Sequence, residues 1–116
     1  MTFAIECTRV DEQNCVAVAG EVDAETAPQL RDALLAALAD AEAVVVDLDS
    51  VTFMDSSGLS ALLVAHRAAE ASGGTLRLRD VPGRVMKLLT ITGLDELLTV
   101  ETAPADDSPD LDGVVP

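Results

Sequence analysis

An aspartate, two serines and a glycine occupy residues 55–58, between two apolar stretches of the chain. The apolar run at 43–48 predicts a buried strand, and the apolar period from Leu59 to His66 predicts an amphipathic helix. The unpaired N–H groups and the positive dipole end of a helix start stabilise an anion. Ser56 is therefore predicted either to cap this helix with its oxygen or to present its hydroxyl where a phosphate is tolerated.

Other constellations that support chemistry are absent or incomplete in the sequence. The single histidine, His66, has no cysteine or serine partner in register, so a nucleophile with a base is not indicated. The nucleophile motif Gly-x-Ser-x-Gly and the phosphate loop Gly-x-x-x-x-Gly-Lys do not occur. Asp47, Asp49 and Asp55 follow or end strands, but Mg²⁺ needs several oxygens at one point, so these aspartates do not indicate a metal site. From these absences together we expect no enzyme activity, no metal and no cofactor.

The composition favours one compact domain. The chain has 116 residues, of which 49% are hydrophobic, enough for a core without metal or disulfide. The formal charge of −14 repels phosphate backbones and anionic lipid, so direct binding to nucleic acid or membrane is not expected. The sequence shows neither a signal peptide nor a membrane-length apolar run, which predicts a cytoplasmic protein.

The two cysteines, Cys7 and Cys15, are predicted to remain free thiols. With a four-residue loop at 11–14, Val10 faces Cys15 and Cys7 faces Val18 across a hairpin. The thiols then point to opposite faces of the sheet and cannot form a bridge.

Strands and helices are predicted to alternate along most of the chain. An antiparallel hairpin is expected first, then helices and strands in turn, which implies right-handed crossovers and a mostly parallel sheet. The fold class is α/β: a single domain, a mixed sheet of four or five strands, and helices mainly on one face. The strands are expected at 2–10, 15–22, 43–48, 75–79 and 97–100, and the helices after Asp23 or Thr26, from the 55–58 turn to Ser72, and at 84–92. Residues 1–102 form the domain, and the acidic segment 103–116 is predicted to be disordered.

Three short motifs give the chain a family resemblance. Residues 53–59 read Phe-Met-Asp-Ser-Ser-Gly-Leu, with Gly-Glu-Val-Asp at 20–23 upstream and Thr-Gly-Leu at 92–94 downstream. Together they resemble the STAS domain family over residues 2–100. Within it, the chain looks like a bacterial anti-sigma factor antagonist.

The resemblance implies regulation of sigma-factor-dependent transcription by partner switching. In such proteins the first serine of Asp-Ser-Ser-Gly, here Ser56, is phosphorylated by the anti-sigma factor, which is a serine kinase. A metal-dependent serine/threonine phosphatase reverses the modification. The resemblance also implies that Asp23 and Asp55, with Ser56, Ser57 and Gly58, form the partner-binding site.

Two alternatives remain open at this stage. A STAS domain also serves as a scaffold or transporter-associated binding module that is never phosphorylated, with its serines as structural caps. A small enzyme with Ser56 as nucleophile is the other, although it lacks a base.

Overall fold

The structure, a computed structural model, describes residues 3–101. Strand β1 spans Phe3–Val10 and pairs with β2, Gln13–Val22, which is followed by α1, Ala27–Asp40. Strand β3, Ala43–Met54, leads into α2, Ser56–Ser72, and β4 spans Thr75–Arg79. Helix α3, Gly83–Thr92, a short 3₁₀ helix, Leu94–Glu96, and β5, Thr99–Val100, complete the described chain.

The strands form one five-stranded sheet in the order β1-β2-β3-β4-β5. Strands β1 and β2 are antiparallel, whereas the remaining neighbours are parallel. The predicted α/β fold with a mixed, mostly parallel sheet is confirmed, and β3 is the central strand. The carboxyl ends of β2, β3 and β4 consequently meet at one edge of the sheet.

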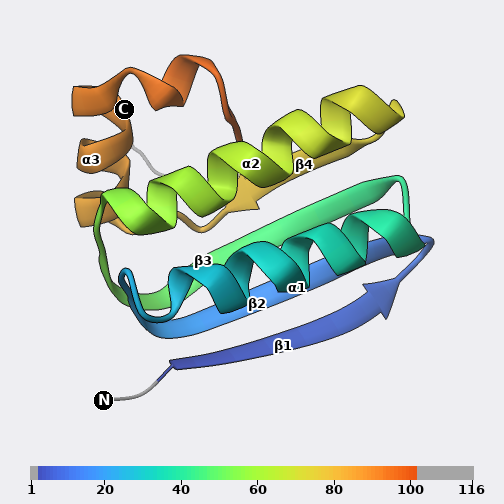
Figure 1. Ribbon diagram of the computed structural model, residues 1–116, viewed down its shortest axis with the longest axis horizontal. Coiled ribbons are helices and arrows are strands. Elements are labelled where there is room, and N and C mark those ends of the chain that lie inside the picture. The colour runs from blue at the N-terminus through green and yellow to red at the C-terminus, as the bar shows by residue number, and fades with distance from the viewer. Residues whose placement is uncertain (1–2, 102–116) are drawn as a thin grey trace, which may run out of the picture.

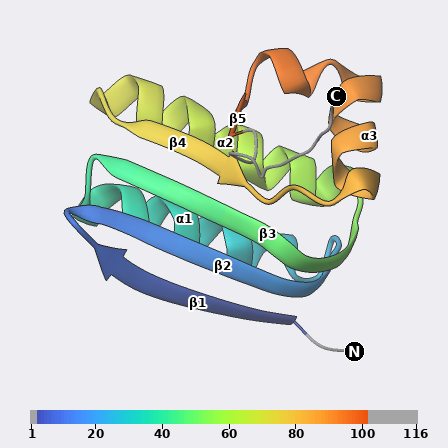
Figure 2. The same ribbon diagram turned by 180° about the vertical axis from the view of Figure 1, so that it is seen from behind.

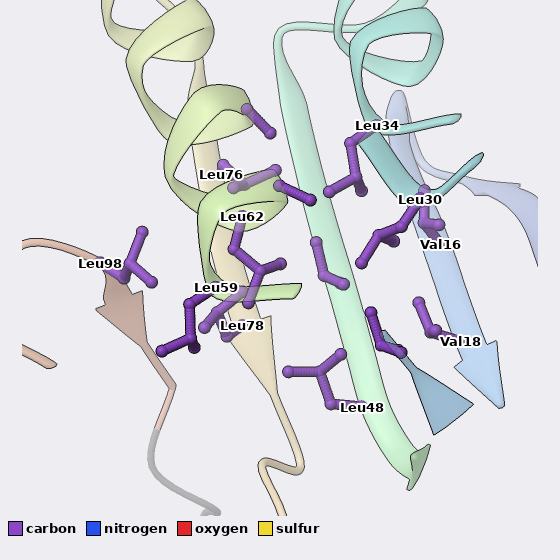
Figure 3. Close-up of a cluster of buried hydrophobic side chains, with 14 of the residues drawn as sticks. Val16, Val18, Leu30, Leu34, Leu48, Leu59, Leu62, Leu76, Leu78 and Leu98 are labelled. Atoms are coloured by element: carbon purple, nitrogen blue, oxygen red, sulfur yellow. The ribbon is translucent and has the colours of Figure 1, made fainter. Parts of the chain in front are cut away.

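Helices α1 and α2 lie side by side on one face of this sheet, as Figure 1 shows, and the opposite face carries no helix within residues 3–101 (Figure 2). The core lies between the helix pair and the sheet (Figure 3). It is built from aliphatic side chains of every layer, which accounts for a core almost without aromatic residues. Its fully buried large members include Leu30, Leu34, Leu48, Leu62, Leu78, Leu89, Val16 and Val18.

The first hairpin is tighter than predicted. Val10 pairs with Gln13, so the turn holds only Asp11 and Glu12, both with positive φ, of 52° and 69°. The predicted four-residue loop is wrong because Asn14 belongs to β2, where its buried amide donates to the Ala37 carbonyl at 3.0 Å. The register shifts by two residues, which leaves the faces unchanged.

In the observed register Cys7 pairs with Val16 and Cys15 with Thr8. Neighbouring residues of a strand point to opposite faces, so the thiols still point apart. Both cysteines are free, as predicted.

Strand β3 continues beyond the predicted 43–48 to Met54. Its register against β2 shifts twice, between the partners of Ala17 and Ala19 and again between those of Gly20 and Glu21. These irregularities break the alternation of apolar and polar side chains, which is why the sequence pattern stopped at Leu48. They also affect the direction in which the chain leaves β3 toward α2.

The other boundaries differ by smaller amounts. Helix α3 begins at Gly83 instead of 84. The last strand is reduced to Thr99–Val100 because the N–H groups of Leu97 and Leu98 donate to the Leu94 carbonyl instead of to a strand. The predicted disordered segment 103–116 lies outside the described residues. Within residues 3–101, no helix has both the length and the apolar character needed to cross a membrane.

The face of the sheet opposite the helices is covered by long polar side chains. Arg77 of β4 donates to Gln13 of β2 at 3.3 Å and Arg79 donates to the Cys15 sulfur at 3.1 Å, both across β3. Val45 is 1% exposed on this face. Partial burial lowers the pKa of Arg79, but Cys15 and Asp47 raise it by more. The arginine therefore remains charged on the same face as this buried valine of the central strand.

Candidate functional site

The turn between β3 and α2 is held by Asp55. Asp55 is the N-cap of α2, and its Oδ1 accepts a hydrogen bond from the Ser57 N–H at 2.8 Å. Its own N–H donates to the Val22 carbonyl at 3.2 Å, which fastens the turn to β2. The hypothesis that Ser56 caps the helix is therefore wrong: Asp55 supplies the capping oxygen.

Ser56 is the first residue of α2 and its side chain is exposed. Its hydroxyl makes no hydrogen bond to any residue within 3–101, whereas Ser57 is half-buried. The backbone around Ser56 is fixed on both sides, by Asp55 and by the helix. The Ser56 hydroxyl is therefore presented to solvent from a fixed backbone.

Gly58 lies in the first turn of α2 and is buried against the ends of two strands. A Cβ at this position would lie 2.6 Å from Met54 Cγ and 2.9 Å from Val22 Cγ1. Both distances are too short for a side chain, so a glycine lets α2 approach β2 and β3 closely. Gly58 therefore allows the start of α2 to pack closely against the ends of β2 and β3.

Asp23 follows β2 just as Asp55 follows β3, and the register pairs Val22 with Met54. The two aspartates therefore lie at the same edge of the sheet. Asp23 Oδ1 accepts hydrogen bonds from the N–H groups of Glu25, at 3.0 Å, and Thr26, at 3.1 Å. The structure thus brings Asp23 and residues 55–58 together, with Asp23 ordering the loop before α1.

A groove beside the turn was not predicted from the sequence. It has a volume of about 300 Å³, lies between the first turns of α1 and α2, and includes Ser57 in its lining. Two large apolar side chains are exposed in this region: Phe53 beside the turn, at 46%, and Val64 in the lining of the groove, at 43%. Val64 is an apolar residue outside the buried stripe of α2. This was the one feature of the sequence from which the exposed apolar surface could have been predicted. The groove is lined by Ala24, Ala27, Pro28, Arg31, Ser57, Ser60, Ala61 and Val64.

Within the part of the chain that the structure describes, no histidine lies near Ser56. His66 lies ten residues further along α2, about 15 Å at the rise of a helix. Its Nε2 is 3.5 Å from Glu70 Oε2. The three aspartates considered for Mg²⁺ do not converge either, since Asp47 pairs with Arg79 at 3.3 Å and Asp55 caps α2. Within residues 3–101, no three metal-ligating side chains of His, Cys, Asp or Glu gather at one place.

The comparison with protein families agrees with this fold and this turn. The family profile described as "Mlab, STAS domain" matches residues 5–99, which include Asp23 and the whole 55–58 turn. The chain belongs to the STAS domain family. Its candidate site is therefore the β3–α2 corner of a STAS domain.

Similar proteins cover nearly the whole domain. The anti-sigma-B factor antagonist of Bacillus subtilis (strain 168) is 32% identical over 100 residues, 86% of this chain and 92% of the relative. That of Staphylococcus aureus (strain NCTC 8325 / PS 47) is 34% identical over 101 residues, 86% and 94% of the two chains. The crystal structure of an anti-sigma factor antagonist from Mycobacterium paratuberculosis matches with a TM-score of 0.79 at 29% identity, over 90% of each chain.

Proposed function

We propose that this STAS domain is an anti-sigma factor antagonist. In this proposal it binds an anti-sigma factor that is also a serine kinase, and phosphorylation of Ser56 by that kinase ends the binding. A metal-dependent serine/threonine phosphatase restores the free hydroxyl. The names of the similar proteins support the antagonist class. The exposed Ser56 hydroxyl, which has no hydrogen-bond partner within residues 3–101, carries the proposal for the site.

The chemistry assigns the chain the role of substrate. Phosphorylation joins Ser56 Oγ to the γ-phosphorus of ATP and breaks the bond to the β-phosphate, so that ADP leaves. The serine proton needs an acceptor. His66, about 15 Å along α2 at helical rise, is too far away to serve, and the Asp55 carboxylate is engaged in capping α2. The base is therefore supplied by the kinase. The reverse step, hydrolysis of the serine phosphate, is likewise catalysed by the phosphatase.

Charge explains how the modification weakens binding. A phosphate adds about −1.5 to −2 charges at neutral pH. At Ser56 it lies in a corner that already holds the carboxylates of Asp23 and Asp55. A partner surface fitted to a neutral hydroxyl meets both added bulk and a desolvation cost. A loss of about 3 kcal/mol at this contact weakens binding more than a hundredfold, without any rearrangement of the domain.

The surroundings of Ser56 suit a protein partner. Phe53 provides exposed apolar area beside the helix start. The groove between α1 and α2, lined in part by the exposed Val64, provides a concave surface beside Ser57. The net charge of −14 steers a partner with a basic face and opposes direct contact with nucleic acid. The proposal places this exchange in the bacterial cytoplasm, where the kinase finds ATP.

Mapping the phosphate tests the proposal. The chain is incubated with the anti-sigma factor encoded in the same genome and ATP, and the modified residue is located by peptide mass spectrometry. We expect one phosphate on Ser56 in the parent chain and in Ser57→Ala, and none in Ser56→Ala. Phosphate on Ser57 contradicts the site but leaves the antagonist class intact. Binding without any phosphate favours the scaffold or transporter-associated module.

A further inference from the structure

The start of α2 has few free donors left for a phosphate on Ser56. The Ser57 N–H donates to the Asp55 carboxylate at 2.8 Å. The N–H groups of Gly58 and Leu59 both donate to the Asp55 carbonyl, at 3.1 and 3.2 Å. With the N–H groups of residues 57–59 engaged, the Ser56 N–H is the one backbone donor of this helix start without a partner within residues 3–101, too few for the three oxygens of a phosphate. A phosphate on Ser56 needs a partner from another element.

Arg84, in the first turn of α3, lies beside this corner. Its Nη1 donates to the Thr52 carbonyl at 2.6 Å, so its guanidinium lies at the end of β3. Thr52 precedes Ser56 by four residues, which separates them by at most about 14 Å of extended chain. Figures 1 and 2 both show α3 next to the N-terminal end of α2. Arg84 is exposed, so its long side chain can turn toward Ser56 through solvent once it releases the Thr52 carbonyl.

Arg84 also differs from most other basic residues in having no carboxylate partner among residues 3–101. Each of the four paired arginines contacts an acid: Arg9 with Asp40, Arg31 with Asp32, Arg77 with Glu101 and Arg79 with Asp47. The remaining basic residues are Arg67, eleven residues along α2 from Ser56, and Lys87, one turn beyond Arg84. Arg84 is thus the unpaired cation of the described chain whose contacts bring it to the β3–α2 corner.

We propose that Arg84 is the residue that binds the phosphate on Ser56, exchanging its hydrogen bond to the Thr52 carbonyl for the phosphate oxygens. This inference rests on the proposed function for the presence of that phosphate. A guanidinium binds phosphate through paired, charge-assisted hydrogen bonds that are stronger than a bond to a neutral carbonyl. The first turn of α3 contains no acidic residue to compete for Arg84.

The exchange gives the modification a structural consequence. In the unmodified protein Arg84 ties α3 to β3 through Thr52. In the phosphorylated protein the same side chain ties α3 to the start of α2. The phosphate is held in a fixed position instead of moving freely in solvent, so the partner meets a defined obstacle beside Asp23 and Asp55.

The test uses phosphoserine installed at position 56 by genetic code expansion, so that it needs no kinase. The ³¹P NMR signal of the phosphoserine is followed against pH in the parent chain, in Arg84→Gln and in Lys87→Gln. A nearby cation stabilises the dianion, so we expect the titration midpoint of Arg84→Gln to lie on the order of one pH unit above the parent. The carboxylates of Asp23 and Asp55 shift the midpoint the opposite way and are common to all three proteins.

The control, Lys87→Gln, removes the same charge one turn away and should leave the midpoint unchanged. Arg84→Lys keeps the charge without the planar fork and should fall between the parent and Arg84→Gln. Equal midpoints for Arg84→Gln and Lys87→Gln overturn the inference, as does a parent midpoint equal to that of Arg84→Gln. Because the phosphoserine is incorporated during translation and needs no kinase, failure of the kinase to modify Ser56 overturns the proposed function alone.

Discussion

Helices α1 and α2 are each preceded by an aspartate that orders a turn, but the hydroxyl groups near the two helix starts have different environments. Each start follows the end of a parallel strand, and each has an aspartate whose carboxylate accepts the N–H two residues later: Asp23 from Glu25 and Asp55 from Ser57. At α1 the Thr26 hydroxyl is buried, accepts the Asp23 N–H at 3.0 Å and donates to the Glu21 carbonyl at 2.9 Å. At α2 the Ser56 hydroxyl is exposed and has no partner within residues 3–101.

This difference separates a structural hydroxyl from one available for chemistry. The Thr26 hydroxyl cannot be modified without breaking two hydrogen bonds in a buried loop. Ser56 can accept a phosphate without losing any contact of the described chain, because Asp55 does the capping. Two turns at the same edge of the sheet therefore differ in their hydroxyl groups: that of Thr26 stabilises the fold, and that of Ser56 is the one to which the proposed function assigns regulation.

The largest effect on stability is expected at the buried hydroxyl. Thr26→Val keeps the shape but leaves the Asp23 N–H and the Glu21 carbonyl without their partner, at a cost of about 2–3 kcal/mol in the free energy of unfolding. Ser56→Ala, the matched change at α2, should alter it by less than about 0.5 kcal/mol. Urea unfolding of both variants measures this. Equal losses would remove the distinction between the two hydroxyls.

A smaller loss is expected where α2 meets the strands. Gly58→Ala brings a methyl group within 2.6 Å of Met54 Cγ, and overpacking of this kind costs roughly 1–2 kcal/mol where a flexible side chain can yield. The control is Gly83→Ala, where no atom lies within 4 Å of the added Cβ. Thermal unfolding should show a lower Tm for the first variant alone. An unchanged Tm for Gly58→Ala would mean that the start of α2 is not tightly packed against the strands.

The smallest of the three losses is expected from the capping residue. Asp55→Ala removes the acceptor of the Ser57 N–H and should cost about 1 kcal/mol. Asp55→Asn keeps a capping oxygen and should stay close to the parent protein. Urea unfolding of the pair tests the assignment. If Ser56→Ala proved more costly than Asp55→Ala, the cap would belong to Ser56 after all.

The sequence predicted the architecture well where apolar periods were regular. The stripes of α1 and α2 and the alternation of Leu76 and Leu78 in β4 follow the helix and strand repeats directly. The prediction failed where a polar side chain takes a buried position, as Asn14 does in β2. It also failed where the bulges of β3 interrupt the alternation before Met54.

The sequence predicted which residues of the site lie together, but it did not predict which of them caps α2. Aspartate and serine both cap helices well, and only the backbone conformation at Asp55 decides between them. The groove beside Ser57 and the position of Arg84 depend on how α1, α2 and α3 approach one another. Such contacts between distant segments leave no periodic signal in a single sequence.

The binding of the kinase by two Ser56 variants tests the central claim most directly. Isothermal titration calorimetry with the anti-sigma factor and nucleotide compares Ser56→Ala with Ser56→Asp, and Ser72→Asp at the far end of α2 controls for net charge. We predict that Ser56→Ala and Ser72→Asp bind as tightly as the parent and that Ser56→Asp binds about a hundredfold more weakly, a difference of about 3 kcal/mol. Equal affinities for Ser56→Ala and Ser56→Asp would contradict the account.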